Sequence, residues 1–161
     1  MKYYMAYGSN LNKEQMRYRC PGAKARGTAL LAGYRLAFKG SKTGAYLTIV
    51  EDPDGFVPVG IWSITKEDEN NLDLYEGYPR FYDKVKVPAS RIKGIYGDEA
   101  REIAQNSIIY IMTEGRPEGE PTSWYLDICM NGYDDFGMDP GPLWDAYAKS
   151  IKNRKGEERW I

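Results

Sequence analysis

With 161 residues, 42% of them hydrophobic, the chain is long enough to bury one core, and we expect a single domain over residues 1–161 that ends in a polar tail from about residue 152. A net charge of −1 provides no basic field for a phosphate backbone, so we expect no nucleic-acid partner. Histidine is absent, which excludes Ser-His-Asp and Cys-His relays and leaves any zinc site without its commonest ligand.

Targeting signals and paired cysteines are also not expected. No apolar stretch approaches the roughly 20 residues that span a bilayer, and a strand pattern that begins at residue 3 leaves no room for a signal peptide. We therefore expect a cytoplasmic protein with no membrane partner. Cys20 and Cys129 have no metal-ligand spacing and are predicted to be reduced structural thiols, with a disulfide as the alternative. The oligomeric state is left open.

The first predicted strand, residues 3–7, has apolar side chains on both faces and stops abruptly at Gly8-Ser9-Asn10. Such a turn can aim successive backbone N–H groups into one concavity, which suits a carboxylate or an oxyanion, and Gly8 would permit close approach of a ligand. The alternative is that these residues only turn the chain and cap the following helix.

The remaining elements alternate between strands and helices in an α+β order. Asn12 with Gln15 predicts the start of a helix that ends near Cys20, and Thr65 with Asp68 predicts the start of another that ends at Gly77. Strands are predicted at residues 28–38, 45–51, 57–64, 80–89 and 107–113, a loop or hairpin at 91–104, and helices at 123–130 and 143–151. The sequence KNRKGEER near the C-terminus is interpreted as solvated surface.

Glu76 stands near the end of the second predicted helix, where an ionised carboxylate faces the negative end of the helix dipole. The dipole is worth about 0.3–1 kcal/mol, whereas raising the pKa of a glutamate from about 4.3 to near 7 needs several times that, so burial would have to supply the rest. Apolar neighbours could form the necessary pocket: Leu72, Leu74, Tyr75, Tyr78, Phe81 and Tyr82. Glu76 is thus either an exposed side chain or an acid–base residue.

Other noticeable residues are interpreted as scaffold. Tyr3, Tyr4 and Tyr7 are expected to pack in the core, and the four tryptophans are expected to be packing anchors: Trp62, Trp124, Trp144 and Trp160. The acidic loop with Asp134, Asp135 and Asp139 fits no EF-hand spacing and is expected to be a solvated turn.

Three segments together resemble the γ-glutamyl cyclotransferase-like (AIG2-like) family. YMAYGSNL at the N-terminus resembles the family's signature loop, LDLYEGYPRFY resembles the segment that holds its single catalytic glutamate, and PTSWYL resembles its Pro-Ser-x-x-Tyr-Leu helix entry. The resemblance covers nearly the whole chain and implies a small mixed β-barrel flanked by helices.

The resemblance also implies roles for individual residues. Tyr7, Gly8, Ser9 and Asn10 would hold the glutamyl end of a substrate, largely through backbone N–H groups, and Glu76 would be the catalytic acid–base residue. Tyr82 and Tyr125 would line the substrate-binding pocket. The glutathione-specific branch carries a hydrophobic residue at the position of Asn10, which argues against membership of that branch.

The activity implied is the release of an amine and 5-oxoproline from a γ-glutamyl amide or γ-glutamyl amino acid, by attack of the substrate's own α-amine. The resemblance also implies an enzyme that uses neither a metal nor a cofactor. The leaving group is not determined, and the candidates are γ-glutamyl amino acids, a γ-glutamyl-ε-lysine isopeptide and a γ-glutamyl biosynthetic intermediate. Two alternatives use the same pocket: a non-catalytic module that binds a small metabolite or peptide, and an acyltransferase that passes the glutamyl group to another amine.

Overall fold

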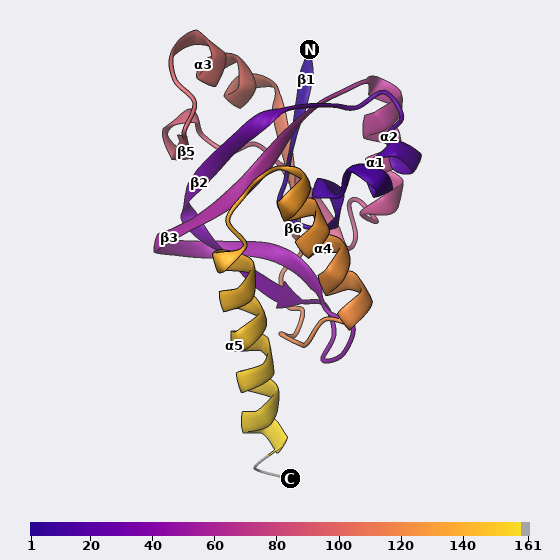
Figure 1. Cartoon of the computed structure of the whole chain (residues 1–161), viewed down its shortest axis with the longest axis vertical. Helices are drawn as coiled ribbons and strands as arrows, with labels where there is room; N and C mark the ends of the chain where they lie inside the picture. The colour runs from indigo at the N-terminus through magenta and orange to yellow at the C-terminus, as the bar shows by residue number, and fades with distance from the viewer. Residues whose placement is uncertain (159–161) are drawn as a thin grey trace.

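A computed structural model describes the backbone of residues 1–158 and the side chains of residues 1–152, and it shows an α+β domain (Figure 1). The strands are β1 (Lys2–Ala6), β2 (Lys24–Lys39), β3 (Tyr46–Ile64), β4 (Tyr82–Val85), β5 (Ile92–Lys93) and β6 (Ser107–Met112). The helices are η1 (Ser9–Leu11), α1 (Lys13–Arg19), α2 (Lys66–Tyr75), η2 (Ala89–Arg91), α3 (Gly97–Asn106), α4 (Ser123–Asp135) and α5 (Gly141–Glu158).

The six strands form one mixed sheet in the order β4-β6-β1-β3-β2-β5. β1 pairs in parallel with β6 and antiparallel with β3, so the first strand lies inside the sheet and is buried on both faces, as its apolar pattern predicts. The predicted α+β class with a mixed sheet is confirmed. Within the described residues, however, no strand pairing joins β4 to β5, so the sheet remains open where a closed barrel was expected.

Three of the predicted strands form a single long hairpin of β2 and β3. Its pairing passes from Ala32 with Phe56 to Tyr34 with Glu51, so that residues 52–55 bulge out of the ladder. The predicted strands at 45–51 and 57–64 are therefore the two paired halves of β3. Figure 1 shows this hairpin curving across the molecule, with α4 and the start of α5 beside it.

Local capping signals located the starts of α1 and α2 correctly. The Asn12 side chain accepts a hydrogen bond from the Gln15 amide, and Thr65 and Asp68 form a reciprocal capping box. The predicted loop at 91–104 is wrong, because α3 covers most of its second half and buries Ile103 and Ala104. Tertiary packing of that narrow apolar face stabilises a helix whose sequence is otherwise polar.

The C-terminal helices are longer than predicted. α4 continues to Asp135 and α5 to Glu158, so the backbone of the predicted tail is helical from residue 152 to residue 158. The prediction that the KNRKGEER side chains are solvated lies almost entirely outside the described side chains. In Figure 1, α5 starts beside the sheet and extends well beyond it.

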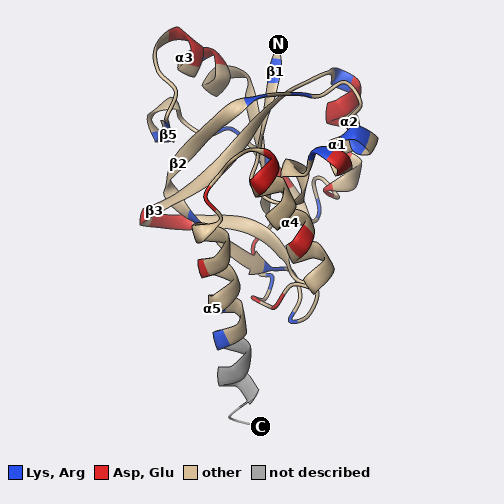
Figure 2. Ribbon diagram, in the orientation of Figure 1, with Lys and Arg blue, Asp and Glu red and all other residues tan. Residues whose placement is uncertain are grey.

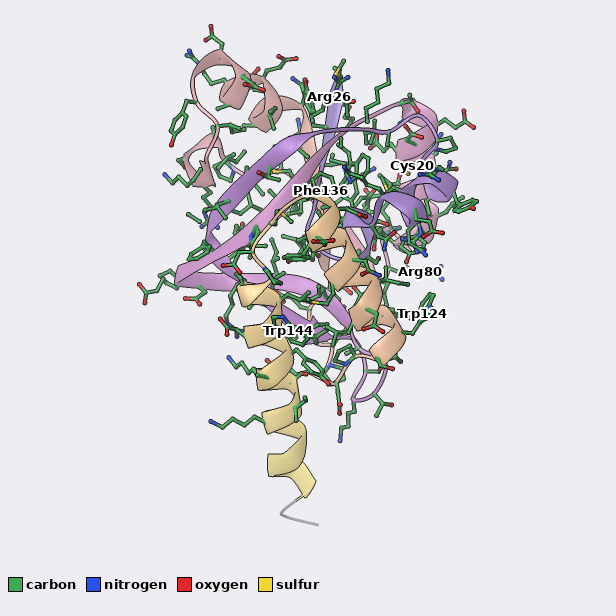
Figure 3. All side chains as sticks on the ribbon, in the orientation of Figure 1. Cys20, Arg26, Arg80, Trp124, Phe136 and Trp144 are labelled. Carbon is green, nitrogen blue, oxygen red and sulfur yellow. The ribbon has the colours of Figure 1, made fainter. Side chains whose placement is uncertain are left out.

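The cysteines and tryptophans only partly match expectation. Cys20 and Cys129 are both buried and unpaired, which confirms reduced thiols, and Trp62 is buried. Trp124, on α4, and Trp144, near the start of α5, are 68% and 45% exposed, so neither is a fully buried packing anchor (Figure 3). Trp160 lies outside the described residues.

Charged side chains of both signs are distributed over the described part of the molecule (Figure 2). Among the described residues, no group of three or more metal-ligating side chains occurs, including around Asp134, Asp135 and Asp139. Lys and Arg are interspersed with Asp and Glu over the ribbon (Figure 2). Of the helices that are described, none is both long and apolar enough to cross a membrane.

A buried charge cluster ties α2 to the sheet. The Glu69 carboxylate is nearly inaccessible and lies 2.8 Å from the Nζ atoms of both Lys2 and Lys84. Lys84 also contacts Asp73, which accepts a 2.6 Å hydrogen bond from the Tyr110 hydroxyl. Because these partners come from β1, β4 and β6, the cluster fixes α2, and with it the helix end at Glu76, relative to the first strand.

Close packing of α4 holds the turn that follows β1. Gly132 faces η1 so tightly that an added Cβ would lie 2.7 Å from the Asn12 amide nitrogen and 2.7 Å from the Leu11 Cβ. The Asn12 side chain also donates to the Ile128 carbonyl of α4, at 3.2 Å. A residue larger than glycine would therefore push α4 away from η1.

We predict that Gly132→Ala lowers the free energy of unfolding by about 1–3 kcal/mol, the usual cost of overpacking. Chemical denaturation at neutral pH measures the change. Asn131→Ala is the matched control, since Asn131 is exposed on the same helix, and it should change stability by less than about 0.5 kcal/mol. A Gly132→Ala protein as stable as the unmodified chain would contradict the packing argument.

Candidate active site

A pocket of about 320 Å³ opens between the turn after β1 and the end of α2. Its walls are Tyr4, Tyr7, Gly8, Ser9, Asn10, Tyr46, Leu47, Leu74, Tyr75, Glu76, Gly77, Phe81, Tyr82, Tyr110 and Tyr125. All seven residues predicted to act at the site are among them, although they come from three distant parts of the sequence. The only acidic side chain in this lining is that of Glu76, and no basic side chain lines it.

Glu76 is the C-cap of α2. Its amide donates to the Leu72 carbonyl at 2.8 Å, and Gly77 then ends the helix with a φ of 63°, a left-handed conformation that glycine adopts at little cost. The carboxylate is not directed into bulk solvent: Oε1 accepts a 3.1 Å hydrogen bond from Nδ2 of Asn10. The end of α2 and the turn after β1 therefore meet through these two side chains.

Burial raises the pKa of the Glu76 carboxyl group to about 7, and the positive charge of Arg19 partly opposes that rise. The helix dipole alone is too weak to produce such a change. Taking the charged form out of water is the physical cause, as expected for a carboxylate among aromatic walls. Near neutral pH the group is close to half ionised, which suits both acceptance and release of a proton.

Asn10 connects the parts of the site. Its side-chain Nδ2 donates to the Tyr4 hydroxyl at 3.0 Å as well as to Glu76, and its Oδ1 accepts from Nη1 of Arg19 at 2.6 Å. Its backbone carbonyl accepts a 2.9 Å hydrogen bond from the indole of Trp62. Asn10 is thus buried with every side-chain polar atom paired, and its amide has one well-defined orientation.

Three of the tyrosine hydroxyls that line the pocket are bonded to main-chain atoms. Tyr7 donates to the Tyr110 carbonyl at 2.6 Å and Tyr82 to the Leu47 carbonyl at 2.7 Å, while the Leu47 amide donates to the Tyr125 hydroxyl at 3.1 Å. Burial raises the pKa of Tyr7, Tyr82 and Tyr125 above the ordinary value, so these phenols are neutral. They form rigid, uncharged walls.

Gly8 allows the chain to pass close to Tyr125. An added Cβ would lie 3.3 Å from the Tyr125 hydroxyl oxygen and 3.5 Å from the Leu47 Cβ. The φ of Gly8 is −129°, so its role here is space rather than an unusual backbone angle. Ser9 and Asn10 follow as the first residues of η1, where helix geometry leaves the leading N–H groups without an intrahelical acceptor.

Sequence reasoning missed several wall residues. Tyr4 packs against the edge of Tyr110 in the core, as expected, but it also lines the pocket and accepts the hydrogen bond from Asn10. Tyr46 and Leu47 come from β3 and gave no local signal, because only the pairing of the long hairpin brings them to the site. The apolar surroundings predicted for Glu76 are partly correct, because four of the six residues line the pocket: Leu74, Tyr75, Phe81 and Tyr82. Leu72 lies in the core, and Tyr78 lies outside the lining.

Comparisons of sequence and of structure with known proteins point to one family. A family model described as "Gamma-glutamyl cyclotransferase, AIG2-like" matches residues 4–127. Proteins named gamma-glutamylcyclotransferase from Homo sapiens and Bos taurus are 30% and 34% identical over 157 and 158 residues, covering 92% and 93% of this chain and 76% and 77% of theirs. A solved structure named gamma-glutamyl cyclotransferase superposes with a TM-score of 0.68 at 26% identity, covering 84% of this chain and 80% of the other.

The raised pKa of Glu76 predicts an effect on stability. The folded state favours the protonated carboxyl, so the unfolded state loses its proton first as the pH rises, and the free energy of unfolding falls between pH 4.5 and about 7 and then levels off. The difference between these values corresponds to at most about 3 kcal/mol. Glu76→Gln should remove this component, as measured by urea denaturation across that pH range.

Glu67→Gln is the matched control, since Glu67 is exposed on the same helix. It should retain the pH dependence of the unmodified protein. A Glu76→Gln protein whose pH dependence matches that of Glu67→Gln would show that Glu76 titrates as an ordinary carboxylate.

Proposed function

The chain belongs to the γ-glutamyl cyclotransferase (AIG2-like) family, and we propose that it releases an amine and 5-oxoproline from a small γ-glutamyl amide, with Glu76 as the acid–base residue. The observation that carries the proposal is the partly buried Glu76 carboxylate, 3.1 Å from Asn10 and in one pocket with Gly8 and Ser9. A site that served only to bind would gain nothing from a carboxyl group whose pKa lies near neutrality.

The chemistry needs few protein groups because the substrate carries its own nucleophile. The α-amino nitrogen attacks the γ-carbonyl carbon of the same glutamyl residue, which closes a five-membered ring; the bond from that carbon to the leaving nitrogen then breaks. A pocket of about 320 Å³ with aromatic walls can hold the glutamyl chain folded for this attack. Orientation effects in well-aligned intramolecular reactions reach about 7–11 kcal/mol.

Glu76 would move one proton in each turnover. Its carboxylate takes the proton from the attacking α-amino nitrogen and then gives it to the leaving nitrogen, so the group is ionised again at the end. A pKa of about 7 keeps both steps accessible near neutral pH. The neutral tyrosine walls exclude water around the reacting atoms and thereby strengthen the electrostatic interactions there.

The turn after β1 would bind the glutamyl end of the substrate. We place its α-carboxylate at Gly8 and Ser9, where leading N–H groups of η1 favour an anion, with Tyr7 and Asn10 as neighbours. Tyr82 and Tyr125 would confine the glutamyl side chain from the opposite wall. The leaving amine would then extend toward the exposed rim formed by Tyr46, Leu74 and Tyr75.

We predict that Glu76→Gln lowers kcat for 5-oxoproline formation by about 10²–10⁴, the usual contribution of general acid–base catalysis, while substrate affinity changes little. The measurement combines mass spectrometry of products from a panel of γ-glutamyl amides with calorimetric binding of the same compounds. Glu67→Gln should leave both unchanged. Weaker binding with normal turnover would contradict the role assigned to Glu76.

The same product analysis separates the alternatives. Formation of 5-oxoproline indicates cyclisation, and a new γ-glutamyl conjugate in the presence of a second amine indicates acyl transfer. Binding of a γ-glutamyl compound without any product would identify a non-catalytic module.

We predict that Gly8→Val lowers affinity for γ-glutamyl substrates at least tenfold, because its side chain would occupy the pocket beside Tyr125. Calorimetric titration measures the loss, and thermal unfolding verifies that the variant is folded. Unchanged affinity in a folded Gly8→Val protein would argue against the proposed binding position of the substrate α-carboxylate.

A further inference from the structure

Arg19 contacts the site without lining it. The residue ends α1, and its guanidinium donates from Nη1 to Oδ1 of Asn10 at 2.6 Å and from Nη2 to Oε1 of Gln15 at 2.8 Å. Nothing in the sequence pattern distinguished it from Arg17 on the same short helix. The roles described above use Asn10 and Glu76 but give no function to this cation.

The chemistry of the guanidinium group decides which way the Asn10 amide points. A guanidinium can only donate hydrogen bonds, so the atom of Asn10 that faces Arg19 has to be the oxygen. The NH₂ group is then turned toward Glu76 and the Tyr4 hydroxyl, and its two N–H bonds match those two acceptors. The opposite orientation would place the amide oxygen against the carboxylate and leave the guanidinium facing N–H groups.

We propose that Arg19 is a positioning residue of this site, which holds the Asn10 amide so that it donates to the Glu76 carboxylate and places a positive charge behind that amide. A hydrogen bond donated to a carboxylate stabilises its ionised form, whereas an amide oxygen turned toward it would favour the protonated form. Arg19 therefore favours the ionised form of Glu76 in two ways, through the oriented amide and through its own positive charge. Both make the carboxylate available to accept a proton.

Arg19 is itself firmly held. Its guanidinium carbon lies 3.7 Å from the centroid of the Tyr75 ring, and its backbone carbonyl accepts a 3.0 Å hydrogen bond from the side chain of Asn71. Both partners belong to α2, so the helix that carries Glu76 also anchors the residue that orients Asn10. The charge is consequently fixed in place and does not depend on a mobile surface side chain.

The other groups that face Glu76 carry no opposing charge. They are the phenols of Tyr4 and Tyr7 from the first strand and its turn, Tyr82 from β4, Tyr110 from β6 and Tyr125 from α4. Burial raises the pKa of each above its ordinary value, so all are neutral over the range in which Glu76 titrates. Among these surroundings, Arg19 is the cation that acts on the carboxylate.

The test is a titration of Glu76 without substrate, followed by carbon-13 NMR of the glutamate carboxyl groups, with the Glu76 signal assigned by its loss in Glu76→Gln. Arg19→Met removes the charge and the donors but keeps most of the side-chain length. We expect the midpoint of Glu76 to rise by about one pH unit or more, a tenfold increase in proton affinity. Arg19→Lys, which keeps the charge and can still donate to Asn10, should restore most of the difference.

The Asn10 side-chain amide gives a second readout that a purely structural role would not change. In the unmodified protein its N–H signals should shift with the same midpoint as Glu76, and in Arg19→Met that correlation should disappear. Arg17→Met is the matched control, because Arg17 is exposed on the same helix, and it should behave like the unmodified protein. Equal Glu76 midpoints in Arg19→Met and Arg17→Met would overturn the proposal. If Arg19→Met does not fold, Arg19→Gln removes the charge instead, and a Glu76 midpoint equal to that of Arg17→Met would then overturn it.

A kinetic experiment, which rests on the proposed function, is interpreted separately. The acidic limb of kcat/KM for 5-oxoproline formation should move to higher pH in Arg19→Met, so that the loss of activity is at least tenfold near pH 6 and small near pH 9. A loss that is equal at all pH values would indicate a general structural defect and contradict the proposal. If the unmodified protein formed no 5-oxoproline but the Glu76 midpoint still moved in Arg19→Met, the proposed function would fail and the role of Arg19 would stand.

Discussion

The hydrogen bond between Asn10 and Glu76 joins two halves of the site that have no covalent reason to meet. One half is a buried strand that ends in a glycine-containing turn, and the other is the C-terminal end of a helix 66 residues later. Each half is fixed independently: α4 packs against η1 through Gly132, and the Glu69 cluster ties α2 to the sheet. Because both side chains are already held in place, the 3.1 Å contact between them costs little side-chain entropy at the time of reaction.

The tyrosines explain how a site without histidine can handle protons near neutral pH. The hydroxyl groups of Tyr7, Tyr82 and Tyr125 are bonded to main-chain atoms, so these walls have satisfied hydrogen-bonding groups when buried and yet carry no charge. The low local polarity raises the pKa of Glu76, and one cation behind Asn10 limits that rise. The balance of these two effects, rather than any unusual side chain, gives a carboxyl group that can both accept and donate a proton.

The scaffold separates these tasks among its elements. The sheet supplies Tyr4, Tyr82 and Tyr110 as walls. The ends of two helices supply Glu76 and Arg19. The long β2–β3 hairpin brings Tyr46 and Leu47 to the pocket. Tyr46 and Leu74, at the rim, are far more exposed than the residues around Glu76.

The sequence by itself determined the features that depend on short-range physics. The buried first strand, the caps at Asn12 and Thr65, the helix end at Gly77, and the residues Tyr7 to Asn10 and Glu76 could all be recognised, because capping, strand alternation and turn chemistry act over a few residues and because the motifs resemble a known family. Tertiary structure alone decided that the sheet stays open, that residues 97–106 form a helix, and that Tyr4, Tyr46 and Arg19 reach the site. Most of these outcomes depend on contacts between segments that are tens of residues apart in the sequence. The role of Arg19 depends on which atom of the Asn10 amide faces its guanidinium. No local sequence pattern predicts either.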